Sequence, residues 1–237
     1  MESAFKAVVN TFDGDWKKVV NKWALMNGHY VAEFGDLPAW YVETSNTAML
    51  AAAAWQCGCP ALCEPRINKQ KFTGRPGRPK TYVGRLDMEI YIDDHWTWVE
   101  AKKDHFQFTQ KKDGRSERRQ RFVNLIESSR KSAENSASSA KECGWNVSAA
   151  AFFSASVVAD SVERGDDKSA RDGLGKEDAV SRAINSEIEA MLERLEKYKL
   201  KTGASLKVAV FGNTNSRLQE WTTVDYPAAF GIIMLDL

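Results

Sequence analysis

The sequence lacks the features that would place it in a membrane or a secretory pathway. Uncharged apolar stretches such as Ala48 to Trp55 are far shorter than the ~20 residues that a membrane-spanning helix needs. No signal peptide is visible, because residues 1–10 carry Glu2 and Lys6 and have no apolar core. We therefore expect a cytoplasmic protein that has no membrane partner.

An excess of charge of either sign is also missing. The net charge is +1, so any DNA binding has to come from local basic clusters rather than from a global field. No internal repeat or low-complexity tract is visible. Hydrophobic residues make up 43% of the chain, with eight tryptophans among them, which is enough for a sizeable core. A length of 237 residues then indicates a single elaborated domain spanning residues 1–237.

Cysteine is scarce, as is usual in a compartment where thiols stay reduced. Three of the four lie in the segment Cys57-Gly-Cys59-Pro-Ala-Leu-Cys63, and Cys143 lies far away. Their spacing matches neither a zinc ribbon nor the usual ferredoxin runs. The interpretation we favour is buried or incidental thiols at a helix end, and metal binding by these cysteines stays open.

The most informative pattern lies between residues 82 and 102. Two alternating runs flank an Asp-Asp pair at 93 and 94, and because side chains alternate across a strand, the pattern is typical of a hairpin with distinct faces. In the first run the apolar face carries Tyr82, Leu86, Met88, Ile90 and Ile92, and the polar face carries Arg85, Asp87, Glu89 and Tyr91. In the second run one face carries Trp96, Trp98, Glu100 and Lys102.

A two-residue turn would fix the register of this hairpin. Counting back from the turn places Asp87 opposite Glu100, and Arg85 opposite Lys102. Opposed Cβ atoms are roughly 4.5–5.5 Å apart, so two carboxylates there repel each other unless a cation lies between them. A loop of odd length would instead put Asp87 and Glu100 on opposite faces. The alternative interpretation is a half-exposed hairpin whose charges are only solvated.

Asp87, followed after the hairpin by Glu100-Ala101-Lys102, resembles the signature of the PD-(D/E)xK nuclease superfamily. The resemblance covers residues 40–158 and implies the restriction-endonuclease-like fold, an α/β fold whose αβββαβ core has a mixed central sheet flanked by helices. Leu86 stands where many members have proline, and no Gln-x-x-x-Tyr follows the lysine, which argues against the RecB-like exonuclease branch. The implied elements are a helix at 43–56, a strand at 64–72, the hairpin, a helix at 115–142 and a strand at 145–158.

The same resemblance implies a Mg²⁺-dependent endodeoxyribonuclease of restriction, defence or recombination type. Mg²⁺, for which Mn²⁺ can substitute, prefers hard oxygen ligands, lowers the pKa of its bound water and polarises the phosphate. By resemblance, Asp87, Glu100 and the carbonyl of Ala101 bind the metal. Lys102 orients or deprotonates the attacking water and offsets the negative charge that develops on the phosphate.

Glu43 is the extra acid that the resemblance implies, as a further catalytic residue and metal ligand. Its position at the start of a predicted helix also has a simpler explanation, because an acid there stabilises the helix dipole. Glu89 lies on the polar face of the hairpin and is the rival for the same role, with a solvated strand charge as the alternative. Both alternatives stay open at this point.

Two basic segments are candidates for DNA binding. The segment Thr73-Gly-Arg-Pro-Gly-Arg-Pro-Lys-Thr81 resembles the Gly-Arg-Pro core of AT-hooks, whose arginines enter a narrow A·T minor groove. A surface loop shaped by proline is the favoured alternative, and a nonspecific phosphate grip through Arg75, Arg78 and Lys80 is compatible with either.

The second basic segment is the start of the predicted helix at 115–142. Arginine there works against the helix dipole, so a polyanion nearby is one interpretation and a solvated face is the other. The arginines of this segment are Arg115, Arg118, Arg119 and Arg121.

The remaining segments are predicted to surround a catalytic core at 39–158. Residues 1–38 show helical spacing that predicts two short helices packed on the core or against a second subunit, so a homodimer stays open. The C-terminal elaboration at 159–237 is predicted to contain a loop at 159–175, an amphipathic helix at 181–200 and strands at 206–211 and 230–235.

Two other classes of function compete with the nuclease. One is a catalytically inactive nucleic-acid-binding or assembly protein on the same fold, and the other is an unrelated ligand-binding α/β domain whose acids merely coincide. Degenerate nucleases usually lose an acid or the lysine. Because all three motif positions are intact here, the sequence favours the enzyme.

Overall fold

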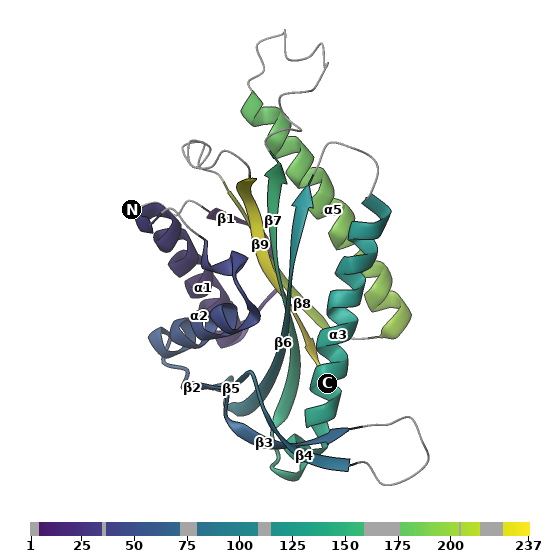
Figure 1. Ribbon diagram of the computed structural model, residues 1–237. Coiled ribbons are helices and arrows are strands. Elements are labelled where there is room, and N and C mark those ends of the chain that lie inside the picture. Colours follow the sequence, from purple (N-terminus) through teal and green to yellow (C-terminus); the bar gives the residue numbers. More distant parts are fainter. Residues whose placement is uncertain are drawn as a thin grey trace.

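The computed structural model describes residues 5–34, 37–71, 80–108, 115–158, 176–203, 205–213 and 225–237. It is an α/β fold in which helices flank a mixed seven-stranded sheet of order β1-β8-β9-β7-β6-β5-β2 (Figure 1). A two-stranded ribbon, β3-β4, lies at one end of the molecule, separate from the main sheet.

The elements follow one another closely along the described chain. The strands are β1 (Phe5–Asn10), β2 (Ala61–Cys63), β3 (Arg66–Lys71), β4 (Lys80–Arg85), β5 (Met88–Ile92), β6 (His95–Phe108), β7 (Asn146–Val158), β8 (Leu206–Asn213) and β9 (Asp225–Asp236). The helices are α1 (Gly14–Phe34), the 3-10 turn η1 (Pro38–Trp40), α2 (Glu43–Gln56), α3 (Arg115–Glu142) and α5 (Lys176–Thr202).

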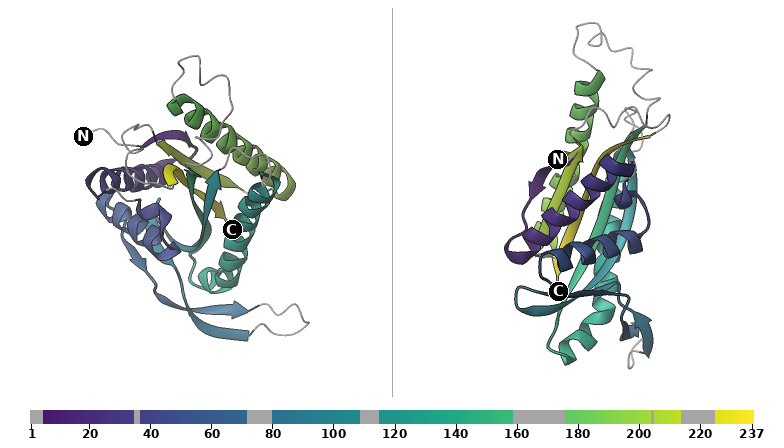
Figure 2. Two further views of the ribbon diagram at one scale, coloured as in Figure 1. Left: turned by 45° about the horizontal axis from the view of Figure 1, so that its top comes forward. Right: turned by 90° about the vertical axis from the view of Figure 1, so that its left-hand side faces the viewer.

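Two hydrophobic cores lie on opposite faces of the sheet, one under α1 and α2 and the other under α3 and α5 (Figure 2). In the first core Trp23 packs on Phe152 and Phe230, with ring centroids 5.6 and 5.1 Å away. In the second, Phe122 packs on Phe153 at 5.5 Å. The neighbours Phe152 and Phe153 thus point to different cores, as expected of a central strand that is buried on both faces.

The strand β6 is longer than its neighbour β5, so part of the β6 backbone on that side is left without a neighbouring strand among the described residues. β5 pairs antiparallel with β6 only from His95 to Val99. On the other side, β7 pairs parallel with β6 from Thr97 to Phe108, after the crossover helix α3. From Glu100 onward, β6 therefore has no partner on its β5 side among the described strands.

The predicted two-residue turn is confirmed. Ile92 pairs with His95, and both turn residues, Asp93 and Asp94, have positive φ angles of 48° and 64°. Positive φ at both central positions is what a tight hairpin turn of type I′ requires, and aspartate tolerates it better than most residues. The antiparallel ladder ends at Met88 opposite Val99, one position short of the predicted pair of acids.

The first run of the hairpin is not one continuous strand, and here two predictions were wrong. Arg85 does not lie opposite Lys102, because it pairs with Arg66 in the ribbon. Leu86 does not share a face with Met88, because Leu86 is buried in the α3 core and Met88 in the α2 core. The chain leaves regular strand geometry at residues 86–87, and an interrupted strand loses the period of two on which both predictions depended.

Two helix predictions are confirmed, since α2 and α3 span 43–56 and 115–142. The strand predicted at 145–158 is β7, and the C-terminal helix and strands are α5, β8 and β9. Among the described helices, none combines the length and apolarity needed to cross a membrane. The predicted loop at 159–175 lies outside the described residues.

Two other predictions were wrong. Residues 1–38 were expected to form two short helices, but they contain the strand β1 and one long helix, α1. β1 pairs with β8 more than 190 positions away in the chain, and local periodicity carries no trace of such a partner. The strand expected at 64–72 as part of the core sheet is β3, which joins the ribbon instead, and the strand beside β5 is β2, at 61–63.

Candidate metal and nucleic-acid site

Ala101 lies on the open edge of β6, and both of its backbone polar groups are used there. The N–H and C=O of one strand residue point to the same side, which here is the side that β5 leaves uncovered. The Ala101 N–H donates to Oδ2 of Asp87 at 2.7 Å, and the Ala101 carbonyl accepts from Nζ of Lys102 at 2.6 Å. The Asp87 carboxylate therefore takes the place of a neighbouring strand.

Glu43, the first residue of α2, approaches the same edge. Nζ of Lys102 lies 3.2 Å from each of its carboxylate oxygens, and both side chains are about one-third exposed. Burial raises the pKa of Glu43, Lys102 lowers it, and the negative charges of Asp87 and Glu100 raise it further. The net result is a pKa above the ordinary value.

Glu100 is buried on the α3 side of β6. Its Oε1 accepts from Ser136 Oγ at 2.6 Å and forms an ion pair with Lys69 Nζ at 2.6 Å. Its Oε2 accepts from Ser132 Oγ at 3.2 Å. Burial raises the pKa of Glu100, the hydrogen bonds from Lys69 and Ser136 lower it, and the charge of Asp87 raises it.

The structure thus connects most of the predicted residues, though not all through direct contacts. Hydrogen bonds and ion pairs link four of them in series: Glu43, Lys102, Ala101 and Asp87. Glu100 belongs to the same electrostatic neighbourhood. Its charge raises the pKa of Glu43, and the charge of Asp87 raises the pKa of Glu100. Within the described residues, no three His, Cys, Asp or Glu side chains are grouped closely enough to hold a metal ion by themselves.

The donor set nevertheless has the chemistry that Mg²⁺ prefers. Three carboxylates and one backbone carbonyl supply hard oxygen atoms, and Mg²⁺ usually takes only one or two carboxylates and keeps several waters. Two ammonium groups, those of Lys102 and Lys69, face these acids. The residues present therefore fit a divalent cation, which would compete with Lys69 and Lys102 for the carboxylates.

Lys69 is the residue of this site that sequence reasoning missed. It lies on β3, outside the motif, and its stem crosses Gly84 on the opposing strand. A Cβ at Gly84 would lie 2.9 Å from Cδ of Lys69. A glycine within a strand often marks such a close approach, so Gly84 was the available signal, although it does not reveal which side chain approaches.

Glu89 and Lys103 lie apart from this group. Glu89 pairs with Trp98 across the β5–β6 ladder, whereas Glu43 is the acid that contacts Lys102. Nζ of Lys103 donates to the carbonyl of Trp40, and burial lowers the pKa of Lys103.

The predicted DNA-binding arginines of α3 lie away from the acids. Arg118 and Arg119 are half-buried, and three of their guanidinium nitrogens (Nε and Nη2 of Arg118, Nε of Arg119) are buried without a hydrogen-bond partner in the described part of the chain. Arg118 precedes Ser132 by about 21 Å along the helix axis, at 1.5 Å per residue. Arg121 is engaged, since it pairs with Asp104 at 2.6 Å.

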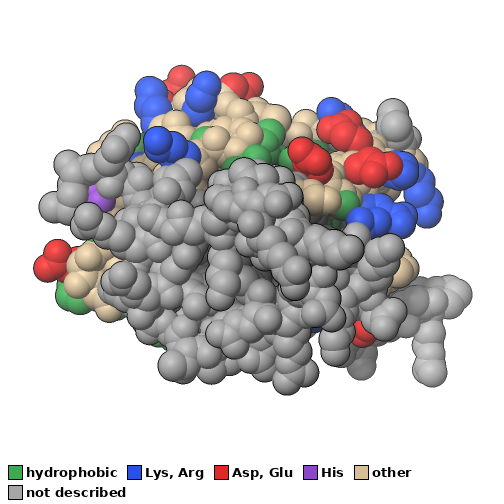
Figure 3. Space-filling view, turned by 90° about the horizontal axis from the view of Figure 1, so that it is seen from above, with side chains coloured by type: hydrophobic (Ala, Val, Ile, Leu, Met, Phe, Trp, Pro, Cys, Tyr) green, Lys and Arg blue, Asp and Glu red, His purple; other side chains and the backbone are tan. Residues whose placement is uncertain are grey.

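The other basic candidates are described only in part. Arg75 and Arg78 lie outside the described residues, and for Lys80 and Arg115 only the backbone is described, at the starts of β4 and α3. At the end of the molecule where β6 and β7 terminate, basic and acidic side chains are mixed over the described surface (Figure 3), in keeping with the small net charge.

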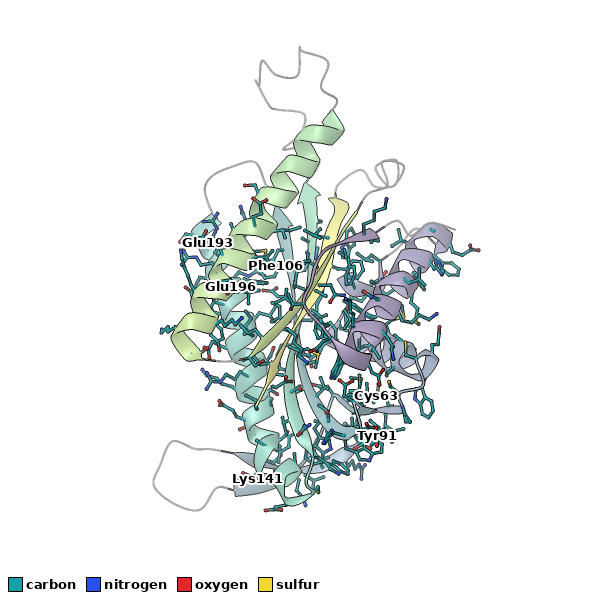
Figure 4. All side chains as sticks on the ribbon, turned by 180° about the vertical axis from the view of Figure 1, so that it is seen from behind. Cys63, Tyr91, Phe106, Lys141, Glu193 and Glu196 are labelled. Atoms are coloured by element: carbon teal, nitrogen blue, oxygen red, sulfur yellow. The ribbon has the colours of Figure 1, made fainter. Side chains whose placement is uncertain are left out.

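The cysteines are all free thiols. Cys59 is buried, Cys57 is half-buried, and Cys63 and Cys143 are exposed. Cys63 pairs with Met88 at the β2–β5 end of the sheet (Figure 4). Burial raises the pKa of Cys59, as expected of a thiol that packs at a helix end.

Comparison with protein-family models, curated proteins and solved structures finds no match to this chain.

Proposed function

We propose that this protein is a Mg²⁺-dependent endodeoxyribonuclease of the restriction-endonuclease-like fold. The observation that carries the proposal is the set of contacts at the open edge of β6, where Asp87 and Lys102 meet on Ala101 and Lys102 reaches Glu43. Restriction, defence or recombination is the role that the resemblance implies.

The order of elements supports the same fold. The described elements include a helix, three strands, a helix and a strand in this order along the chain: α2, β2, β5, β6, α3 and β7. Among the described elements, the β3-β4 ribbon alone is inserted into this series. β2, β5 and β6 pair antiparallel, and β7 adds parallel to β6. This order supports the αβββαβ arrangement that the motif implies, with Asp87 and Glu100 where β5 and β6 diverge.

In this mechanism each residue has a separate task. Asp87, Glu100, Glu43 and the Ala101 carbonyl would hold Mg²⁺, which when bound polarises the phosphate and lowers the pKa of its water. Lys102 lies between Glu43 and the Ala101 carbonyl, where its ammonium would orient the attacking water or, as the neutral amine, would take a proton from it. It also offsets the charge that develops on the phosphate.

DNA is the proposed partner, and its binding is assigned to the two basic segments that the sequence identifies. Arg118 and Arg119 are half-buried near the start of α3, and guanidinium groups form strong charge-assisted hydrogen bonds with phosphates. Arg75, Arg78, Lys80 and Arg115 are proposed for the same role on the basis of the sequence. A second copy of the chain remains compatible with this arrangement.

The proposal is tested by incubating the purified protein with linear, circular and single-stranded DNA in Mg²⁺, in Mn²⁺ and in chelator. We expect metal-dependent cleavage that Asp87→Asn or Lys102→Ala lowers by about 10³-fold, because the first removes a metal ligand and the second removes the ammonium that offsets the developing charge. Glu134→Gln, a surface acid on α3, is the matched control and should cut normally. Undiminished cutting by either site variant would exclude this mechanism.

A catalytically inactive nucleic-acid-binding protein is the second candidate. The observation that favours it is that both oxygens of Glu100 are engaged, by Lys69 and by two serines. Binding of DNA with no cleavage in either metal would select this function.

A further inference from the structure

One lysine from outside the motif enters the proposed metal site. Nζ of Lys69 lies 2.6 Å from Oε1 of Glu100, and the two side chains are 11% and 2% exposed. Burying a charge is costly unless it is paired and hydrogen-bonded. Since Ser132 and Ser136 also donate to Glu100, both oxygens of this acid have partners within the protein.

The ribbon that carries Lys69 is hydrogen-bonded both to α3 and to the backbone of Asp87. Ser139 Oγ of α3 donates to the Asn68 carbonyl at 2.6 Å, and Lys141 lies beside the ribbon at the end of α3 (Figure 4). At the base of the ribbon, the Glu64 N–H donates to the backbone carbonyl of Asp87 at 3.2 Å. The position of the ribbon, the direction of Asp87 and the surroundings of Glu100 are therefore linked.

The ribbon itself is built to accept this lysine. In the β3–β4 ladder Ile67 lies opposite Gly84, and Ile67 is buried in the α3 core. The missing side chain at Gly84 leaves the space that the Lys69 stem fills. The burial of the Lys69 ammonium group is thus a specific feature of how the ribbon packs, and Lys69 is not a solvent-exposed surface charge.

We propose that Lys69 is a positioning residue, an internal counter-ion that holds Glu100 and the β3–β4 ribbon in place before a divalent cation binds and that opposes the binding of that cation. This inference rests on the proposed function. A divalent cation near Glu100 repels the Lys69 ammonium, so metal binding weakens the docking of the ribbon. By thermodynamic reciprocity, a ligand that draws the ribbon away from Glu100 strengthens metal binding to the same extent.

The test uses the full chain, with Mn²⁺ affinity measured by calorimetric titration and melting temperature measured with and without saturating Mn²⁺. Lys69→Met removes the counter-ion, so we expect a lower melting temperature without metal. We also expect Mn²⁺ to bind about tenfold more tightly, within the usual range of coupling between two sites. The Mn²⁺-induced rise in melting temperature should be larger than in the wild type.

Two further variants separate this inference from a purely structural role. Lys69→Arg keeps the charge and should restore wild-type Mn²⁺ affinity, whereas Lys197→Met, on the exposed face of α5, should change nothing. Should Lys69→Met fail to fold, Gly84→Ala displaces the lysine stem and should shift the affinity in the same direction by a smaller factor. If Lys69→Met, or Gly84→Ala in its place, binds Mn²⁺ no more tightly than the wild type does, the inference is overturned.

Asp87→Asn shows which of the two proposals has failed. If the wild type binds Mn²⁺ and Asp87→Asn does not, the proposed metal site stands, and the Lys69 variants alone decide the counter-ion role. If Asp87→Asn binds Mn²⁺ as tightly as the wild type, or the wild type binds none, both proposals are overturned.

Discussion

At the scale of single residues, the candidate site depends on what happens where a strand loses its neighbour. Ala101 is fully buried in the α2 core through its side chain, so only its backbone faces the open edge. The N–H is satisfied by Asp87 and the carbonyl by Lys102. Backbone groups that a sheet would ordinarily pair thus orient two of the motif side chains.

The burial of Glu43, together with repulsion from neighbouring acids, predicts a specific pH dependence of stability. Burial and the charges of Asp87 and Glu100 raise the pKa of Glu43 above its ordinary value of 4.5. The folded protein therefore holds this proton more tightly than the unfolded chain does, and its stability falls as the pH rises from 4.5 through the raised pKa. Below this window the contribution is constant.

Glu43→Gln should remove that loss of stability. In chelator, we expect the variant to gain melting temperature relative to the wild type as the pH rises through the window, and to keep the gain at neutral pH. Melting curves between pH 4 and 8 test this, with Glu134→Gln as the control that should track the wild type. A difference in melting temperature between variant and wild type that stays constant across this pH range would contradict a raised pKa of Glu43. Such a gain, together with lost cleavage, would be a trade between stability and activity.

At the scale of elements, the Asp93–Asp94 turn does more than connect β5 to β6. Oδ1 of Asp93 accepts from the backbone N–H of Asp15, in the first turn of α1, at 2.9 Å. Gly14 has a φ of 52°, and a Cβ there would lie 2.6 Å from the same oxygen. The hairpin turn therefore caps a helix that precedes it by some eighty residues, and glycine leaves room for the contact.

Asp93→Ala should destabilise the protein by about 1 kcal/mol, the usual cost of losing a helix N-terminal cap. The alanine also tolerates the positive φ of this turn position less well. Asp93→Asn keeps an acceptor oxygen and the same backbone preference, and should cost only a few tenths of that. The free energy of unfolding from urea titration is the measurement. Equal losses in the two variants would show that the contact to α1 contributes nothing.

At the scale of the whole molecule, the sheet is built outward from β6 and β7. These strands pair along twelve consecutive positions, and β9 extends the sheet on the far side of β7. Both faces of β7 are buried under helices. Among the described strands, by contrast, β3 and β4 pair only with each other, and the ribbon is held by its contacts with α3 and Glu100.

Hydrogen exchange should reproduce this hierarchy. We expect the slowest amide exchange in the centres of β7 and β9 and much faster exchange in β3 and β4, because two-stranded ribbons are marginally stable by themselves. Lys69→Met should speed exchange in the ribbon further and leave β7 and β9 unchanged. Ribbon amides as protected as those of β7 would contradict this assignment of stability.

The sequence alone determined the two-residue turn that sets the β5–β6 register, and the resemblance carried by its motif also implied the helices α2 and α3 and the strand β7. The turn depends on neighbouring residues alone, so turn chemistry reports it directly. Only the tertiary structure decided that the strand breaks before Asp87, that β1 closes the far edge of the sheet, that Glu43 meets Lys102, and that Lys69 pairs with Glu100. Each of these joins segments that are distant in the chain, and long-range packing leaves no periodic signal in either partner.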